Sequence, residues 1–361
     1  MTTRRAFLAG LAVASLPRVS WAEVGSPVCL AAGKLADDFV LHGLSATGQS
    51  LFQLALPARG HAAAAHPTQA LAVAFARRPG SFALVIDCLT GHIRHSLAPP
   101  TGRQFNGHGV FSADGSRLMT SEVVAEGSAG RIGVWETAHF TRIAEWDSKG
   151  IGPHDLKRLP DGRLVVANGG IQTDPSDRTK LNLPDMRPNL TLLSPDGVVL
   201  DQVGLSDDLH QNSIRHLALL DDTIAFAMQW QGDEAEPVPQ LGLWTPGAAP
   251  RLCPPTEVQA LAMKGYAGSI AVRKAADGKT SDGGGDLIAL TSAPGGVVML
   301  FDAAGNPLTT HARADLSGVA AVAGGLMATD GQGGIWSCDD QGLGLLATSD
   351  TQWDNHLIAL G

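Results

Sequence analysis

The sequence predicts an all-β fold, a seven-bladed β-propeller. The main observation is a pattern of apolar strand, tight turn and second strand that recurs seven times, and such recurrence is typical of repeat architectures. Composition agrees, because the 43 glycines and 21 prolines fall mostly at turns and long helical periodicity is absent. The seven copies occupy residues 39–54, 82–97, 131–146, 190–203, 241–253, 296–310 and 333–346.

Each blade of a propeller needs four strands, and the chain supplies them in order. In the second blade we expect strands at 108–111, 117–123, 132–136 and 141–146, with the first turn at Ser112–Gly115. Asp-Gly turns of this kind give glycine the positions that need a positive φ. The first residues predicted for the seven blades are His61, His108, His154, His216, Ser269, Ser317 and Asn355.

The seventh blade is predicted to contain both ends of the chain. Residues 353–360 resemble an innermost strand with nothing after it, whereas 27–33, 39–44 and 51–56 resemble three strands without an innermost one. Pairing the C-terminal strand with the N-terminal three closes the ring and removes the exposed sheet edges between the first and last blades.

The N-terminus resembles a twin-arginine export signal. Arg4 and Arg5 precede a short apolar run at 9–16, and Ser20-Trp21-Ala22 suits cleavage after a small residue. The run is too short to span a bilayer. The sequence therefore predicts a signal peptide at 1–22, a periplasmic location and a single propeller domain at 23–361.

The charge of the chain argues against nucleic-acid binding. Removal of residues 1–22 takes away three arginines and no acidic residue, so 23 basic and 35 acidic side chains remain, for a net charge of −12. A nucleic-acid binder needs a basic surface, and none is visible. No later apolar run is long enough to span a membrane.

The four cysteines are scattered and lack the spacing of a metal site or a redox pair. We expect them to be small buried side chains in or beside strands. An oxidising periplasm would allow a disulfide, but the sequence leaves any pairing open for Cys29, Cys88, Cys253 and Cys338.

Histidines gather in the loops that a propeller brings to one face. Several of them lie at equivalent blade starts, as in Asn106-Gly107-His108 and Gly152-Pro153-His154. Equivalent positions point toward the same channel mouth, and imidazole is the commonest transition-metal ligand at neutral pH. The candidate metal ligands are His108, His154, His216, His61, His356, Asp155 and Glu122.

An alternative interpretation is structural. A Gly-His pair before an innermost strand also ties blades together in WD-repeat propellers, through buried side-chain hydrogen bonds. Buried polar groups normally have partners of this kind, so the sequence leaves both roles open for each histidine.

The same loops carry arginines and amides that suit an anionic ligand, because guanidinium groups bind oxyanions by bidentate hydrogen bonds. The longest irregular segment is the insertion 169–189, which we expect to lie as a flap over the channel mouth on the loop-rich face. The candidate ligand-binding residues are Arg103, Arg131, Arg215, Asn168 and Gln229, with Arg78 as a further arginine of this kind.

Motifs of covalent catalysis are missing from the sequence. It contains no Gly-x-Ser-x-Gly, no His-Glu-x-x-His, no phosphate-binding glycine loop and no Cys-x-x-Cys-His. No catalytic residue is therefore predicted.

Five segments resemble a known family, the group of twin-arginine-exported propellers called domain of unknown function fifteen-thirteen. They are residues 102–122, 150–171, 180–190, 210–218 and 266–271. The resemblance implies a fold similar to the quinoprotein amine dehydrogenase β-chain and WD-repeat propellers, and a setting among periplasmic iron-uptake proteins of the imelysin type. It implies no catalytic residues. This chain has Thr173-Asp174-Pro175 where the family often has a histidine.

Two functions remain open. The first is a binding or scaffold protein in periplasmic metal handling, with iron or copper at a histidine-rich channel mouth and iron-uptake or imelysin-like proteins as partners. The second is a metal-dependent propeller enzyme, either a lactonase-like hydrolase or an oxidoreductase. The abundance of histidine argues against calcium, which prefers oxygen ligands.

Overall fold

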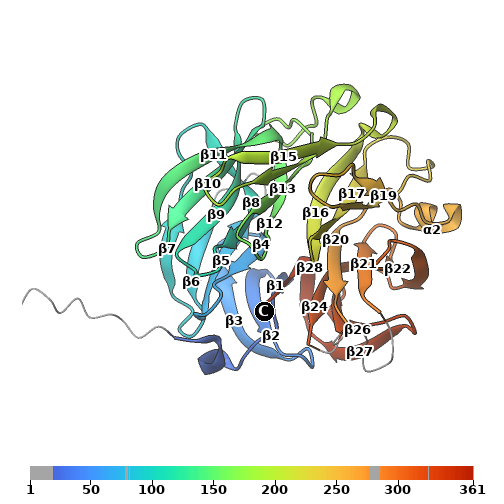
Figure 1. Ribbon diagram of the computed structural model, residues 1–361. Coiled ribbons are helices and arrows are strands. Elements are labelled where there is room, and N and C mark those ends of the chain that lie inside the picture. Colours follow the sequence, from blue (N-terminus) through green and yellow to red (C-terminus); the bar gives the residue numbers. More distant parts are fainter. Residues whose placement is uncertain (1–18, 78–79, 81, 276–284, 324, 361) are drawn as a thin grey trace, which may run out of the picture.

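The computed structural model describes residues 19–77, 80, 82–275, 285–323 and 325–360. Seven four-stranded antiparallel sheets stand in a ring around a central channel (Figure 1). The predicted seven-bladed propeller is confirmed, and we number its blades in the order used above. Within the described ranges, no helix is long and apolar enough to cross a membrane.

The first four blades follow one another along the chain, each built from four consecutive strands. The first blade consists of β4 (Gly60–Ala65), β5 (Leu71–Ala76), β6 (Ala83–Asp87) and β7 (Ile93–Leu97), and the second of β8 (Arg103–Phe111), β9 (Arg117–Val124), β10 (Ala129–Glu136) and β11 (Thr141–Ile151). The third blade consists of β12 (Pro153–Arg158), β13 (Leu164–Asn168), β14 (Asn189–Leu193) and β15 (Val199–Gly204), and the fourth of β16 (Asn212–Leu220), β17 (Thr223–Trp230), β18 (Leu241–Trp244) and β19 (Arg251–Leu252).

The remaining blades complete the ring. The fifth blade consists of β20 (Ser269–Arg273), β21 (Leu287–Ser292), β22 (Val297–Asp302) and β23 (Pro307–Ala312). The sixth consists of β24 (Leu316–Val322), β25 (Gly325–Asp330), β26 (Gly334–Cys338) and β27 (Leu343–Thr348). The seventh consists of β28 (Thr351–Ala359), β1 (Cys29–Leu35), β2 (Asp38–Leu44) and β3 (Ser50–Leu56). Short helical turns lie between strands: η1 (Trp21–Val24), η2 (Leu183–Asp185), η3 (Asp207–Leu209) and α2 (Glu257–Ala262).

The seventh blade joins the two ends of the chain as predicted. Strand β28 pairs antiparallel with β1, from Cys29 opposite Ala359 to Leu35 opposite Thr351. In Figure 1 the red C-terminal strand therefore lies beside the blue N-terminal strands. The pairing covers the edge that β1 would otherwise present to solvent.

Apolar side chains fill the spaces between neighbouring blades. Between the third and fourth blades, for example, Val165 and Leu190 share a buried cluster with Ile214, Phe226 and Trp244. Burial of each large apolar side chain contributes about 1.5–3 kcal/mol. Because every blade packs on two neighbours, the core is a ring of such layers around the channel.

The four cysteines are all buried, and none forms a disulfide. Burial raises the pKa of Cys29, Cys88 and Cys338 to about 12. These thiols stay protonated at neutral pH and behave as small core side chains, as the sequence suggested.

Irregular pairing occurs where most of the innermost strands begin. The register shifts between Gly60 and Ala63 in β4, between Phe105 and Gly109 in β8, and between Pro153 and Asp155 in β12. Shifts also occur in β16 and β28. A β-bulge re-aims a side chain that regular pairing would hold against the sheet. The bulges therefore allow side chains at these positions to point along or into the channel.

Candidate functional site

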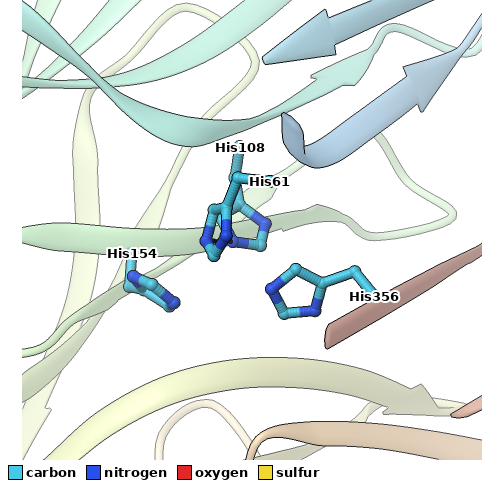
Figure 2. Close-up of side chains that lie close together, drawn as sticks. All are labelled: His61, His108, His154 and His356. Carbon is cyan, nitrogen blue, oxygen red and sulfur yellow. Dashed lines mark hydrogen bonds between the residues drawn. The ribbon is translucent and has the colours of Figure 1, made fainter. Parts of the chain in front are cut away.

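Four imidazoles meet at the channel, each carried by the innermost strand of a different blade. His61 lies on β4, His108 on β8, His154 on β12 and His356 on β28, each within the irregularly paired stretch of its strand. Figure 2 shows the four rings directed toward one common space. Residues separated by up to 295 positions in the chain thus form one cluster.

The spacing of the ring nitrogens suits a single metal ion. One nitrogen from each of these four residues lies within 4.8 Å of all the others. The shortest separation joins Nε2 of His61 to Nε2 of His108, at 3.2 Å. Two nitrogens bound to one tetrahedral ion at about 2.1 Å are about 3.4 Å apart. The other pairs are separated by up to 4.8 Å, so binding one ion would draw these rings closer together.

A fifth imidazole borders the cluster. His216 on β16 has its ring centroid 4.8 Å from that of His154 and 4.7 Å from that of His356. It lies outside the group of four whose nitrogens converge, but it is close enough to contact a ligand held there.

Asp155 orients His108 from behind. Its Oδ1 lies 3.3 Å from Nδ1 of His108, and its Oδ2 accepts a hydrogen bond of 3.0 Å from the backbone N–H of Leu217. Burial opposes ionisation, but Lys157 and His108 hold the pKa of Asp155 well below its usual value. The carboxylate keeps the ring proton on Nδ1 and leaves Nε2 of His108 directed at the cluster.

Burial keeps most of these imidazoles neutral. It lowers the pKa of His216 to about 3 and holds the pKa values of His154 and His356 well below the ordinary value, with nearby cations acting in the same direction. Neutral imidazole is the form that ligates metals. The burial that gives these side chains about 5–6 % exposure also prepares them to bind an ion.

Other buried histidines have ordinary structural partners. Nδ1 of His66 accepts hydrogen bonds from the backbone N–H groups of Thr68 and Gln69, and His42 contacts the hydroxyls of Ser50 and Thr351. The cluster residues instead face one another. Among the described residues, no hydrogen-bond partner reaches the buried Nε2 of His356. Contacts between blades involve His108, through Asp155 and His61, and His154, through Arg215, but they leave ring nitrogens of the cluster facing one another.

A cavity of about 230 Å³ opens above the cluster. Four cationic side chains line the cavity, and amide and phenol groups complete its rim. The residues that line it are His61, His154, His216, His356, Arg77, Arg178, Lys180, Arg215, Ile171, Thr173, Gln229, Gln231, Tyr266 and Asn355. The cavity is thus a route from the loop-rich face to the imidazoles.

The insertion between β13 and β14 supplies part of the cavity wall. Asn182 closes its base, donating from Nδ2 to the Gly170 carbonyl and accepting from the Gln172 N–H. An isolated bridge between Thr173 and Lys180 holds the segment as a hairpin-like loop. These contacts place the insertion against the channel mouth.

Four of the residues considered from the sequence lie away from the cavity. Glu122 is fully buried in a bidentate ion pair with Arg142, at 2.7 and 2.9 Å. Asn168, on β13 of the third blade, donates to the Ser148 carbonyl on β11 of the second blade and to the Thr191 hydroxyl on β14 of its own blade. These residues already have partners, so we leave them out of the site.

Arg103 and Arg131 are the other two predicted residues that lie away from the cavity. Both pair with Glu145 on β11, the outermost strand of the second blade, at 2.9 and 3.4 Å. Arg78 lies outside the described residues. Of the proposed ligand-binding side chains, Arg215 and Gln229 do line the cavity.

Sequence reasoning missed several cavity residues. Arg77 follows β5 directly and Gln231 follows β17, both in loops without a recognisable motif. Tyr266 begins the segment 266–271 that resembles the family, but nothing in that resemblance assigned it to a site. A signal did exist for Asn355, which precedes His356 at a blade start. The sequence showed the charged residues of the insertion, but it did not show that Arg178 and Lys180 line the cavity.

These observations define the class of protein: a seven-bladed β-propeller with a buried imidazole cluster beneath a cationic cavity. The chain belongs to the family described as protein of unknown function (DUF1513), whose model matches residues 54–360. A search of curated proteins found no match.

Solved structures with similar folds are propellers of distant sequence. Kuenenia stuttgartiensis hydrazine synthase aligns with a TM-score of 0.59 and 13% identity, over 81% of this chain and 86% of that chain. The WD40 repeats of RRP9 align with a TM-score of 0.56 and 13% identity, over 84% and 88% of the two chains. At this identity the likeness concerns the fold alone.

Proposed function

We propose that this propeller is a periplasmic metal-binding protein that holds one transition-metal ion at the channel mouth. His61, His108, His154 and His356 are the proposed ligands, with His216 beside them. The observation that carries the proposal is the convergence of four ring nitrogens, one from each residue, within 4.8 Å of one another. Contacts with neighbouring blades at His108 and His154 do not by themselves require four ring nitrogens to face one another.

The ligand set indicates the kind of metal. Imidazole suits iron, copper, zinc and nickel, whereas calcium and magnesium prefer oxygen. Iron or copper is the proposed ion, iron because of the family resemblance and copper because it binds nitrogen ligands most tightly among these divalent ions. The ion would face the cavity on one side, where a further ligand can approach.

The proposal is tested by metal titration of untagged protein prepared from the periplasmic fraction. Wild type should bind one equivalent of Cu²⁺ or Fe²⁺, and the Cu²⁺ form should show coupling to several imidazole nitrogens in its electron paramagnetic resonance spectrum. The double variant His108→Ala/His154→Ala should bind at least about 100-fold more weakly, because it removes two of the four ligands.

The matched control is His92→Ala/His139→Ala. It removes two exposed imidazoles elsewhere on the surface and should leave the affinity unchanged. Equal metal affinity in the two double variants, or a wild-type spectrum without nitrogen coupling, would refute the site. Recovery of the precursor only from the cytoplasm would contradict the proposed export, which depends on Arg4 and Arg5 outside the described residues.

A further inference from the structure

The cavity above the imidazoles carries an unusual concentration of positive charge. Arg77 follows β5, Arg178 and Lys180 come from the insertion, and Arg215 comes from β16. Three separate segments thus direct four cations at one cavity in a chain whose net charge is −9. Among the described residues that line the cavity there is no carboxylate. Such a cluster creates a local potential that attracts anions.

Arg215 is the deepest of these cations. The residue is 8% exposed, and its Nη1 lies 3.5 Å from Nδ1 of His154. Its buried Nε has no hydrogen-bond partner among the described residues. An unsatisfied buried donor lowers stability, so a buried guanidinium donor usually has a hydrogen-bond acceptor.

The cations also repel one another. Burial lowers the pKa of Arg77, with Arg59 and Arg178 lowering it further and Asp354 opposing them. Burial likewise lowers the pKa of Arg215 to about 10, with Arg178 contributing in the same direction. Both groups stay charged at neutral pH. Nη1 of Arg77 already lies 3.9 Å from Oδ1 of Asp354, so an anion in the cavity would relieve mainly the repulsion between Arg178 and Arg215.

The rim can add hydrogen bonds to the charge. The phenol of Tyr266 accepts a hydrogen bond of 3.1 Å from Nδ2 of Asn355, and Nζ of Lys180 donates at 2.6 Å to Oε1 of Gln231. The cavity volume is about 230 Å³. The site is therefore suited to a small polar molecule.

We propose that this cavity binds a small oxyanion with at least two negative charges, such as a di- or tricarboxylate, between the four cations. Arg215 and the insertion residues Arg178 and Lys180 would hold its oxygens, and one oxygen would face the imidazoles on the cavity floor. The proposal goes beyond the metal site and does not depend on it. If both sites are occupied, the anion lies where the ion has its open side.

The test is calorimetric titration of chelator-treated, metal-free protein in a buffer without other oxyanions. Citrate and inorganic phosphate are titrated separately, which distinguishes carboxylate from phosphate as the preferred chemistry. At least one should bind with a 1:1 ratio, and the affinity should fall with added sodium chloride because the attraction is largely electrostatic. The double variant Arg178→Gln/Lys180→Gln should lose at least about tenfold in affinity.

Arg187→Gln is the matched control, since Arg187 lies on the same insertion, is 67% exposed at its side chain and does not line the cavity. Its affinity should stay within about twofold of wild type. The proposal is overturned if neither anion binds at millimolar concentration, or if the double variant binds as well as the control variant. Because no metal is present, failure of the metal site would leave this result unchanged.

Discussion

At the scale of single residues, the blade-start histidines could be predicted because the repeat places them at equivalent positions. Glu122 lies only fourteen residues after His108, yet its carboxylate pairs with Arg142 in its own sheet. Spacing along the chain shows which residues share a loop-rich face. It does not show which of two strand faces a side chain occupies, because that depends on local register.

Asp155 is the residue whose role can be tested most directly. Replacing it by asparagine removes the charge that orients His108 but keeps an oxygen for the N–H of Leu217. We expect the metal affinity to fall by about 10–100-fold, the usual effect of losing such a carboxylate partner. The measurement is metal titration, with circular dichroism to verify folding. Asp196→Asn, in an exposed turn, is the control, and equal affinities in the two variants would exclude an orienting role.

At the scale of elements, turn chemistry and strand alternation were sufficient to locate the blades. The bulges at the strand starts were not predictable, because they arise from pairing with the second strand of each blade. The register shift between Phe105 and Gly109 leaves three residues of β8 unpaired, including His108. The sequence therefore predicted that the histidines gather, whereas their convergence follows from irregular backbone that only the structure reveals.

The closing blade contains a titratable group of its own. His42 on β2 packs against Trp353 of β28, with ring centroids 5.0 Å apart, and burial lowers its pKa to about 4. An unfolded chain has a histidine pKa of about 6.5, so between pH 6.5 and 4 the unfolded state binds more protons. Stability should therefore fall as the pH falls through this window, by at most about 3 kcal/mol from this residue.

Denaturant unfolding of wild type and His42→Gln at pH 7.0, 5.5 and 4.5 measures this effect. The variant should lose less stability than wild type over the range, even if its stability at pH 7 is lower. His154, His216 and His356 titrate in both proteins, so the difference between the two slopes isolates His42. Identical slopes would show that His42 is not the source.

At the scale of the whole molecule, the proposed ion would join four blades, the seventh and the first to third. His356 comes from the C-terminal strand that closes the ring, so the ion would hold the closure as well as the site. A ligand that binds only the folded state at 100 times its dissociation constant contributes about 2.7 kcal/mol. In a chain of this size that corresponds to a rise in Tm of a few degrees.

Two variants separate closure by the strand from closure by the ion. Deleting residues 354–361 removes most of the β28 pairing with β1 and exposes that edge, so the metal-free protein should melt roughly 10 °C lower or more. His356→Asn keeps the strand and removes one ligand; its metal-free Tm should stay within a few degrees of wild type, while the increase on adding metal should shrink. Scanning calorimetry with and without Cu²⁺ measures both effects. A truncated protein that melts like the full chain would contradict closure by β28, and an undiminished metal effect in His356→Asn would remove His356 from the site.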